Sequence, residues 1–206
     1  SDPNLPRMAT DAKAYVSPQY ISTFGAEGDS WSGLSLSTQL FTYVLNTDGT
    51  EYSVSDSIEG LTGAVEIQSS YNGLPVTSIA DSAFQDCSSI TSVIIPNSVT
   101  SIEEDAFFGC SSLSSINIPD SVISIGVAAF ANCSSLTSFT IPNGITSISN
   151  DTFYGCTSLT SVTISDSVTS IGYGAFQNCS GLTSIIIPDS VTSIGEAAFG
   201  GSGLTS

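Results

Sequence analysis

The sequence predicts a solenoid of stacked coils, built mainly from short parallel β-strands that are joined by turns and short helical or 3₁₀ corners. Columns of identical residues, held at a constant 23-residue step, indicate this fold class. They are Phe84, Phe107, Phe130, Phe153, Phe176 and Phe199; Cys87, Cys110, Cys133, Cys156 and Cys179; and Ile79, Ile102, Ile125, Ile148, Ile171 and Ile194. One such unit cannot bury its apolar residues alone, so neighbouring units must stack and share a core.

The order of residues within one unit predicts its elements. Two-residue alternation from Ile116 to Ile118 indicates a short strand with one buried face. Pro119 ends this strand because proline has no N–H for the ladder. A second extended stretch leads to Ile125, and Ala129-Phe130 is expected to turn the corner in a single helical or 3₁₀ turn.

Three regions follow from where the repeat begins. Residues 1–37 lack the repeat and are expected to form an N-terminal arm. Residues 38–60 are expected to form an N-terminal capping hairpin, whose turn lies at Asn46-Thr47-Asp48-Gly49. Residues 61–206 are expected to form the solenoid, with about six coils of 23 residues and an incomplete last one. The hairpin would cover the open end of the stack, as solenoids require.

The repeat motif resembles that of a known family. The pattern L-x-x-I-x-I, followed by P-[ND]-S-V-T-S-I-x-x-x-A-F-x-x-C-x-x-L, resembles the BspA-like leucine-rich repeats, as in Leu113 to Cys133 and Leu159 to Cys179. The match covers about residues 61–206 and departs from the pattern at Ser165 and Thr152. The resemblance implies a leucine-rich-repeat solenoid with parallel strands on a concave face. It also implies a secreted or surface protein that binds host or neighbour-cell components.

Charge narrows the choice of partners. The net charge is −17, from 19 acidic residues against two bases, Arg7 and Lys13. Nucleic acids and anionic membrane surfaces both need clustered Lys and Arg, so neither is expected as a partner. No apolar run approaches the roughly 18 residues of a membrane span, so no membrane insertion is expected.

The residue types also argue against catalysis. Histidine is absent, which removes Ser-His-Asp and Cys-His catalysis and His-based zinc sites. No nucleophile with a base, phosphate loop or metal cluster is apparent in the sequence. Glu103-Glu104-Asp105 is interpreted as a solvated corner rather than as a pair of catalytic carboxylates. We therefore expect no enzyme, no cofactor and no metal.

Two columns of residues could bind a metal ion or form disulfide bonds. The cysteine column could form disulfides or bind metal, but five cysteines cannot all pair and one thiolate per coil does not make a zinc site. A buried thiol ladder is the preferred interpretation. The column Asn97, Asp120, Asn143, Asp166 and Asp189 could bind Ca²⁺, but its mixture of Asn with Asp fits turn capping better.

The candidate binding surface is the concave sheet. Side chains alternate faces along a strand, so the residues between buried positions form two rows that face solvent. These are Ser92 and Ile94, Ser115 and Asn117, Ser138 and Thr140, Ser161 and Thr163, and Ser184 and Ile186. The mildly apolar, hydrogen-bonding rows suit a protein or sugar partner, and the alternative is a surface that is merely compatible with solvent.

Other candidate sites lie outside these rows. Asn132, Asn150 and Asn178 fit the N-x-[ST] glycosylation pattern, although two of the three are by-products of the repeat. The arm, which holds Arg7 and Lys13, either packs on its own cap or reaches a neighbouring subunit.

Two functions follow. The first is a non-catalytic extracellular or cell-surface adhesion and recognition module that binds protein or glycan. The alternative is a structural subunit whose copies assemble head to tail into an extracellular filament, through the N-terminal arm and an uncapped C-terminal edge.

Overall fold

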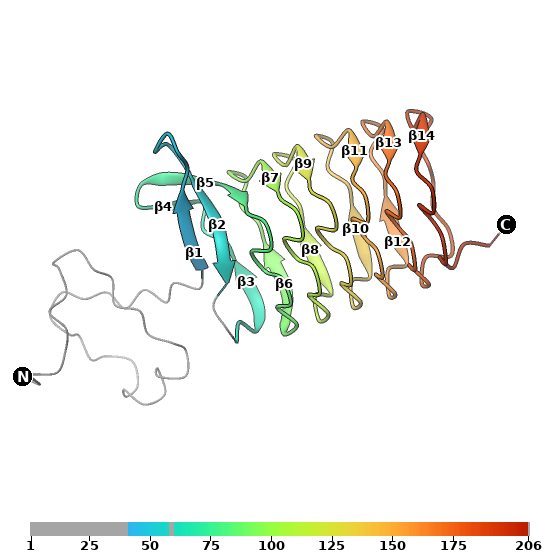
Figure 1. Cartoon of the computed structure of the whole chain (residues 1–206), viewed down its shortest axis with the longest axis horizontal. Helices are drawn as coiled ribbons and strands as arrows, with labels where there is room; N and C mark the ends of the chain where they lie inside the picture. Colours follow the sequence, from blue (N-terminus) through green and yellow to red (C-terminus); the bar gives the residue numbers. More distant parts are fainter. Residues whose placement is uncertain (1–40, 58–59, 206) are drawn as a thin grey trace, which may run out of the picture. The chain divides into compact units, whose positions relative to one another are not determined.

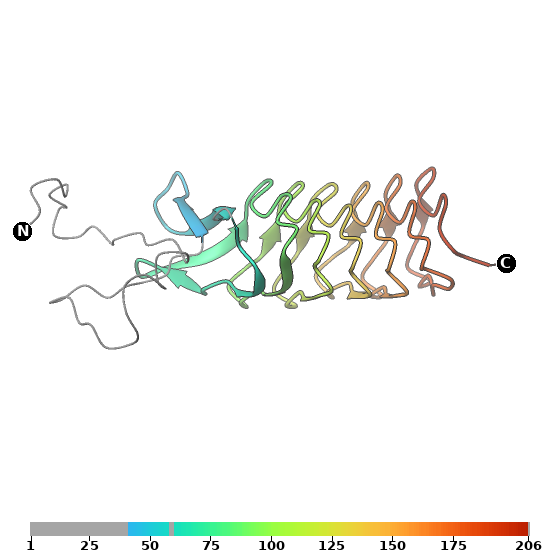
Figure 2. The ribbon, with the colours of Figure 1, turned by 90° about the horizontal axis from the view of Figure 1, so that it is seen from below.

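In a computed structural model of the chain, which describes residues 41–57 and 60–205, the solenoid forms as a row of stacked coils (Figures 1 and 2). The first part contains β1 (Phe41–Leu45), β2 (Tyr52–Ser57), β3 (Gly63–Glu66), β4 (Ser70–Tyr71) and β5 (Leu74–Ile79). The repeats contain β6 (Ile90–Ile94), β7 (Ser101–Ile102), β8 (Ser115–Asn117), β9 (Ser124–Ile125), β10 (Ser138–Thr140), β11 (Ser147–Ile148), β12 (Ser161–Thr163), β13 (Ser170–Ile171) and β14 (Ser193–Ile194). The predicted parallel-strand solenoid is confirmed.

The predicted hairpin is present as β1 and β2, which pair antiparallel. Asn46 closes the turn, since its Oδ1 accepts the Thr50 N–H at 2.9 Å and Gly49 adopts a φ of 73°. β2 also pairs in parallel with β5, so the hairpin continues directly into the sheet of the solenoid. Phe41 is 2% exposed and its ring meets that of Phe84 at 5.4 Å, which places it at the start of the phenylalanine core. The arm with Arg7 and Lys13 lies outside the described residues.

Each repeat contributes one strand to each of two parallel ladders, except the last, which contributes β14 alone. One ladder runs β3-β6-β8 and resumes as β10-β12; the other runs β2-β5-β7-β9 and resumes as β11-β13-β14. Partners in the repeats are 23 residues apart, as in Val93↔Ile116 and Ile102↔Ile125. The pairing Val65↔Val93 spans five more residues, which the hairpin of β4 with β5 accommodates.

The core between the ladders is a stack of phenylalanine rings. Phe84, Phe107, Phe130, Phe153 and Phe176 are fully buried. The rings lie within 9° of parallel, with neighbouring centroids 4.9–5.8 Å apart through to Phe199. Each aromatic pair is worth roughly 0.5–1.5 kcal/mol beyond the burial of its area. The stack therefore couples each coil to its neighbours.

The corners of the coils are turns, and the short helical or 3₁₀ corners expected from the sequence are not confirmed: no described residue is helical. Each corner has two residues with φ between 52° and 72°, and a left-handed residue interrupts a right-handed helix. The two columns are Ser82, Asp105, Ala128, Asp151, Gly174 and Ala197, and Asp86, Gly109, Asn132, Gly155, Asn178 and Gly201. The backbone bonds instead run between coils. For example, the Phe107 N–H donates to the Ala129 carbonyl at 2.8 Å and the Phe153 N–H to the Ala175 carbonyl at 2.8 Å.

The cysteine column is a ladder of buried thiols, and none of the described cysteines forms a disulfide. Cys110, Cys133, Cys156 and Cys179 each donate their S–H to the carbonyl of a phenylalanine in the preceding coil, at 3.1–3.2 Å. The Phe107 carbonyl, for example, accepts both the Cys133 thiol and the Cys110 N–H. Burial raises the pKa of these thiols, so they remain protonated at neutral pH.

Candidate binding surface

Most of the predicted binding rows lie where the sequence places them. We call the residues Ser92, Ile94, Ser115, Asn117, Ser138, Thr140, Ser161 and Thr163, on β6, β8, β10 and β12, the strand surface. All are exposed except Ser92, which is half-buried. Strand pairing sets Ser92 beside Ser115 and Ile94 beside Asn117, and likewise Ser138 beside Ser161 and Thr140 beside Thr163.

The last predicted pair departs from the strand pattern. Ser184 and Ile186 are exposed, but the segment that carries them is not assigned as a strand and does not pair with β12. Ile186 is 85% exposed, and Ile94 at the other end is 58% exposed. The Asn and Thr side chains between them make the middle of the row polar.

Both ladders stop at the same coil boundary. β8 does not pair with β10, and β9 does not pair with β11. The Thr137 N–H reaches the Ser114 carbonyl at 3.5 Å, whereas the equivalent bonds from Ser114 to Thr91 and from Thr160 to Thr137 are 3.0 and 2.9 Å. We call this boundary the seam. Bonds between the corners continue across it, for example from the Phe130 N–H to the Thr152 carbonyl at 3.0 Å, so the coils remain stacked.

A large side chain explains the seam on the side of β8 and β10. Phe139 occupies the buried strand column that holds Val93, Ile116 and Val162 in other coils. Its ring packs 5.0 Å from that of Phe130 and 4.7 Å from that of Phe153. These two rings are 5.8 Å apart, the widest spacing in the stack. Phe139 therefore acts as a wedge between neighbouring coils.

Two further substitutions meet on the other side of the seam. Ile123 replaces a threonine whose hydroxyl in other coils bonds to the preceding coil, as Thr169 does to the Thr146 carbonyl at 3.0 Å. Gly144 replaces a serine that bonds in the same way, as Ser167 does to the Ile145 carbonyl at 2.7 Å. A Cβ on Gly144 would lie 2.7 Å from the Val122 carbonyl oxygen and 3.1 Å from a methyl group of Ile123. By the pattern of its column, the bond lost at Gly144 would run to the Val122 carbonyl across the seam, so its loss leaves the two coils less tightly joined. The bond lost at Ile123 would run to the coil before, at Thr100.

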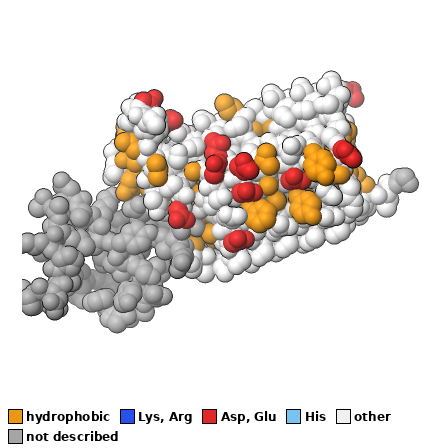
Figure 3. Space-filling view, in the orientation of Figure 1, with side chains coloured by type: hydrophobic (Ala, Val, Ile, Leu, Met, Phe, Trp, Pro, Cys, Tyr) orange, Lys and Arg blue, Asp and Glu red, His pale blue; other side chains and the backbone are white. Residues whose placement is uncertain are grey.

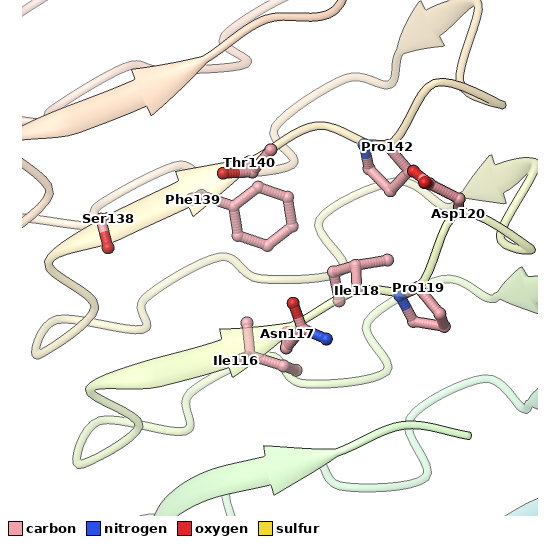
Figure 4. Close-up of a pocket in the computed structure, with 9 residues that line it drawn as sticks. All are labelled: Ile116, Asn117, Ile118, Pro119, Asp120, Ser138, Phe139, Thr140 and Pro142. Carbon is pink, nitrogen blue, oxygen red and sulfur yellow. The ribbon is translucent and has the colours of Figure 1, made fainter. Parts of the chain in front are cut away.

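A cleft opens at the seam on the strand side. It has a volume of about 370 Å³ and is lined by Ile116, Asn117, Ile118, Pro119, Asp120, Ser138, Phe139, Thr140 and Pro142. Figure 4 shows the Phe139 ring extending from β10 toward β8. Asn117, Ser138 and Thr140 belong to the predicted binding rows, whereas the cleft itself was not predicted. The signal for it was the departure of Ile123, Phe139 and Gly144 from their columns.

The corner turns present a second, acidic surface. One of their columns is Asp81, Glu104, Val127, Asn150, Tyr173 and Glu196. Carbonyls in this column accept N–H groups from the preceding coil, as Val127 does from Asp105 at 3.0 Å. Figure 3 shows acidic and hydrophobic side chains side by side on the face toward the viewer. Burial raises the pKa of the Asp105 carboxyl, and the nearby Asp81 carboxylate adds to the shift. Glu103-Glu104-Asp105 lies at this corner, and Lys and Arg are absent from the described part of the chain.

The candidate glycosylation sites lie at the corners. The Asn150 Oδ1 accepts the Tyr173 N–H at 2.8 Å. Asn132 and Asn178 have φ values of 60° and 61°, and their Oδ1 atoms lie where a Cβ on a glycine of the next coil would be. All three side-chain oxygens thus lie close to the next coil. Modification of these residues stays a prediction.

Potential metal ligands do not gather on the described residues. The column Asn97, Asp120, Asn143, Asp166 and Asp189 is exposed along the coils. No group of three or more His, Cys, Asp or Glu side chains within residues 41–57 and 60–205 could hold a metal ion. The strand surface offers hydroxyl, amide and apolar groups, which suit noncovalent binding.

The repeats are similar to a known family. The model of a family described as a BspA type leucine rich repeat region matches residues 77–205 in six copies. No curated protein matches the chain.

Several solved structures share the fold. A leucine-rich repeat protein of T. pallidum aligns with a TM-score of 0.67 and 28% identity, over 80% of this chain and 87% of that one. A leucine-rich cell surface protein of Faecalibacterium prausnitzii A2-165 aligns with a TM-score of 0.58 and 33% identity, over 79% of this chain and 51% of that one. The pneumococcal vaccine antigen PcpA has a TM-score of 0.67 at 24% identity, over 80% of this chain and 46% of PcpA, and supports the fold alone. The chain thus spans about half the length of the last two proteins.

Proposed function

Because the chain belongs to the BspA-type leucine-rich repeat family, we propose that it is a non-catalytic recognition module that binds a protein or glycan through its strand surface. The observation that carries the proposal is the register of exposed side chains, Ser138 beside Ser161 and Thr140 beside Thr163. Solenoids of stacked repeats commonly use such extended surfaces for binding. The paired strands hold these side chains at fixed spacings, so little ordering is needed when a ligand binds.

The chemistry of the strand surface supports a neutral or mixed ligand. Its middle carries Asn117, Thr140 and Thr163, whose amide and hydroxyl groups both donate and accept hydrogen bonds. Ile94 and Ile186 add exposed apolar area toward the two ends of the rows. A partner can therefore combine hydrogen bonds in the middle with apolar contacts beyond them.

An extracellular or cell-surface location goes with this proposal. The relative from Faecalibacterium prausnitzii, at 33% identity, is described as a cell surface protein, and this description supports the location. Among the described residues, no helix is both long and apolar enough to cross a membrane.

A pair of matched variants tests the proposal. Thr163→Arg places a bulky charge on the strand surface, while Thr146→Arg makes the same change at an exposed threonine beside β11, in the other ladder. The intact chain would be screened on glycan and protein arrays, and any saturable ligand titrated against both variants. We expect Thr163→Arg to weaken binding at least tenfold and Thr146→Arg to leave it unchanged. Equal effects of the two variants would refute binding through the strand surface.

Head-to-tail assembly into a filament stays a second prediction. Its proposed arm, with Arg7 and Lys13, lies outside the described residues. Light scattering and electron microscopy of the purified chain at increasing concentration would measure assembly directly. Filaments that vanish in an Arg7→Glu, Lys13→Glu double variant would favour the structural subunit, and a chain that stays monomeric at all concentrations would contradict it.

A further inference from the structure

The seam leaves two strand edges facing each other without a pairing partner. Within the described residues β8 pairs only with β6, and β10 pairs only with β12. Backbone N–H and C=O groups are strong hydrogen-bonding groups, and those at a strand edge remain available to a ligand. At this point the strand surface thus offers backbone groups as well as side chains.

The side chains at the cleft define the chemistry of its occupant. Asn117, Asp120, Ser138 and Thr140 are exposed and line it. Together they provide one amide, one carboxylate and two hydroxyl groups, with more acceptors than donors. A ligand that brings several hydroxyl groups can satisfy such a set, because each hydroxyl both donates and accepts. An anionic ligand would meet the Asp120 carboxylate with no Lys or Arg in the described chain to balance it.

The size of the cleft limits how much of a ligand it can enclose. Its volume of about 370 Å³ lies at the lower end of the range of roughly 300–1,000 Å³ that is typical of small-molecule sites. Phe139 and Pro142 line it but are buried, whereas Ile116 and Ile118 are half-buried and provide the apolar area that can pack against the C–H groups of a ring.

We propose that the cleft between β8 and β10 is a binding site for one neutral sugar unit of a glycan. This inference rests on the proposed function and narrows it, since it selects a glycan over a protein and identifies the part of the strand surface that contacts it. Asn117 and Asp120 hydrogen-bond the sugar hydroxyls from one coil, and Ser138 and Thr140 do so from the next. The wedge at Phe139 keeps the two coils apart and so keeps the site open.

The repeat itself supplies the controls. Thr146 is also an exposed threonine, but it lies beside β11, in the other ladder and outside the strand surface and the cleft. Thr146→Ala therefore removes the same kind of side chain away from the cleft. Phe139→Val restores the residue found at Val93 and Val162 and should let β8 and β10 pair.

The test is saturation-transfer NMR with methyl glycosides of galactose, glucose, mannose, fucose, N-acetylglucosamine and N-acetylgalactosamine, together with anionic sialic acid. We expect at least one neutral glycoside to bind and sialic acid not to bind. Asn117→Ala and Thr140→Ala should each weaken binding about tenfold, as expected for one lost hydrogen bond in a site that stays desolvated, and Thr146→Ala should leave it unchanged. Phe139→Val should abolish binding and slow amide hydrogen exchange along Ser138 to Thr140.

Each other outcome counts against the site. Binding of no neutral glycoside, preference for sialic acid, or binding that survives Asn117→Ala together with Thr140→Ala would overturn the inference. If Phe139→Val fails to fold, the double variant Asn117→Ala, Thr140→Ala still tests the proposed sugar site. A chain that binds none of these sugars but holds another ligand in a manner sensitive to Thr163→Arg would refute the sugar site and leave the proposed function standing.

Discussion

The phenylalanine stack predicts that the same substitution has a position-dependent cost. Phe153 is fully buried and its ring contacts three others, those of Phe130, Phe139 and Phe176. Phe199 has one such contact, with Phe176 at 5.4 Å, and is half-buried. Phe→Leu keeps an apolar side chain but removes the ring, so the difference between the two sites mainly measures ring contacts.

The magnitude follows from the number of ring pairs. Each pair is worth roughly 0.5–1.5 kcal/mol, so Phe153→Leu should lower the free energy of unfolding by about 1.5–4.5 kcal/mol through ring contacts alone. Phe199→Leu should cost about 0.5–1.5 kcal/mol. Incomplete relaxation around the missing ring adds more to the cost of Phe153→Leu than to that of Phe199→Leu, because the centre of the stack is enclosed on both sides.

Urea denaturation followed by circular dichroism measures both variants against the parent chain. Phe153→Leu should shift the whole transition. The loss in free energy of unfolding at Phe199→Leu is compared with that at Phe153→Leu, since both variants remove one ring from the same column. The comparison uses transitions with the same dependence on urea concentration. Equal losses at the two sites would refute the idea that the stacked rings carry the coupling between coils. A larger loss at Phe199 would refute it as well.

Two further predictions use the corners and the thiols. Gly155→Ala should destabilise the fold by about 1–3 kcal/mol in urea denaturation, because Gly155 has a φ of 71° and a Cβ would collide with the Asn132 Oδ1. Gly73→Ala is its control, since Gly73 has a φ of 83° but no atom within 4 Å of the added Cβ, and a cost as large as that at Gly155 would contradict the role of the collision. Burial raises the pKa of Cys179 from 9.0 to about 12, so above pH 9 the unfolded chain loses the thiol proton first. The free energy of unfolding should therefore hold between pH 7 and 8 and fall from about pH 9 toward pH 12, and Cys179→Ala should reduce that slope; an unchanged slope would contradict the assignment.

The sequence was most informative where each coil repeats its neighbour. The 23-residue columns of Phe107 and Ile102 predicted buried positions, and both side chains are fully buried. The hairpin turn was predictable from Asn46 to Gly49 because its local chemistry is sufficient to form it. The corners were not, since Ala128 and Ala197 have positive φ although alanine has no local preference for it. Bonds between coils, such as that from the Ala128 N–H to the Asn150 carbonyl at 3.0 Å, hold that conformation.

The candidate site was harder to predict for a related reason. Comparing repeats emphasises what they share, whereas the cleft comes from what one boundary does not share. Ile123, Phe139 and Gly144 are each a modest departure in a separate column, and only the stacking of coils brings all three to the same boundary. The sequence pattern of one unit does not show that these three residues lie at the same coil boundary.

Different parts of each coil contribute different interactions, and this explains how the substitution at Phe139 is tolerated. The ladder of bonds at the corners, from Phe84 to Ala106 and onward to Phe176 and Ala198, continues through every repeat boundary and keeps bond lengths of 2.7–3.0 Å. A thiol bond to a phenylalanine carbonyl crosses the seam as well, since Cys156 donates to Phe130 at 3.1 Å. Because corner and core hold the stack together, the strands on either side can separate at one boundary without separating the coils. A solenoid built in this way can change its binding surface by substituting one strand residue, as at Phe139, while its framework stays constant.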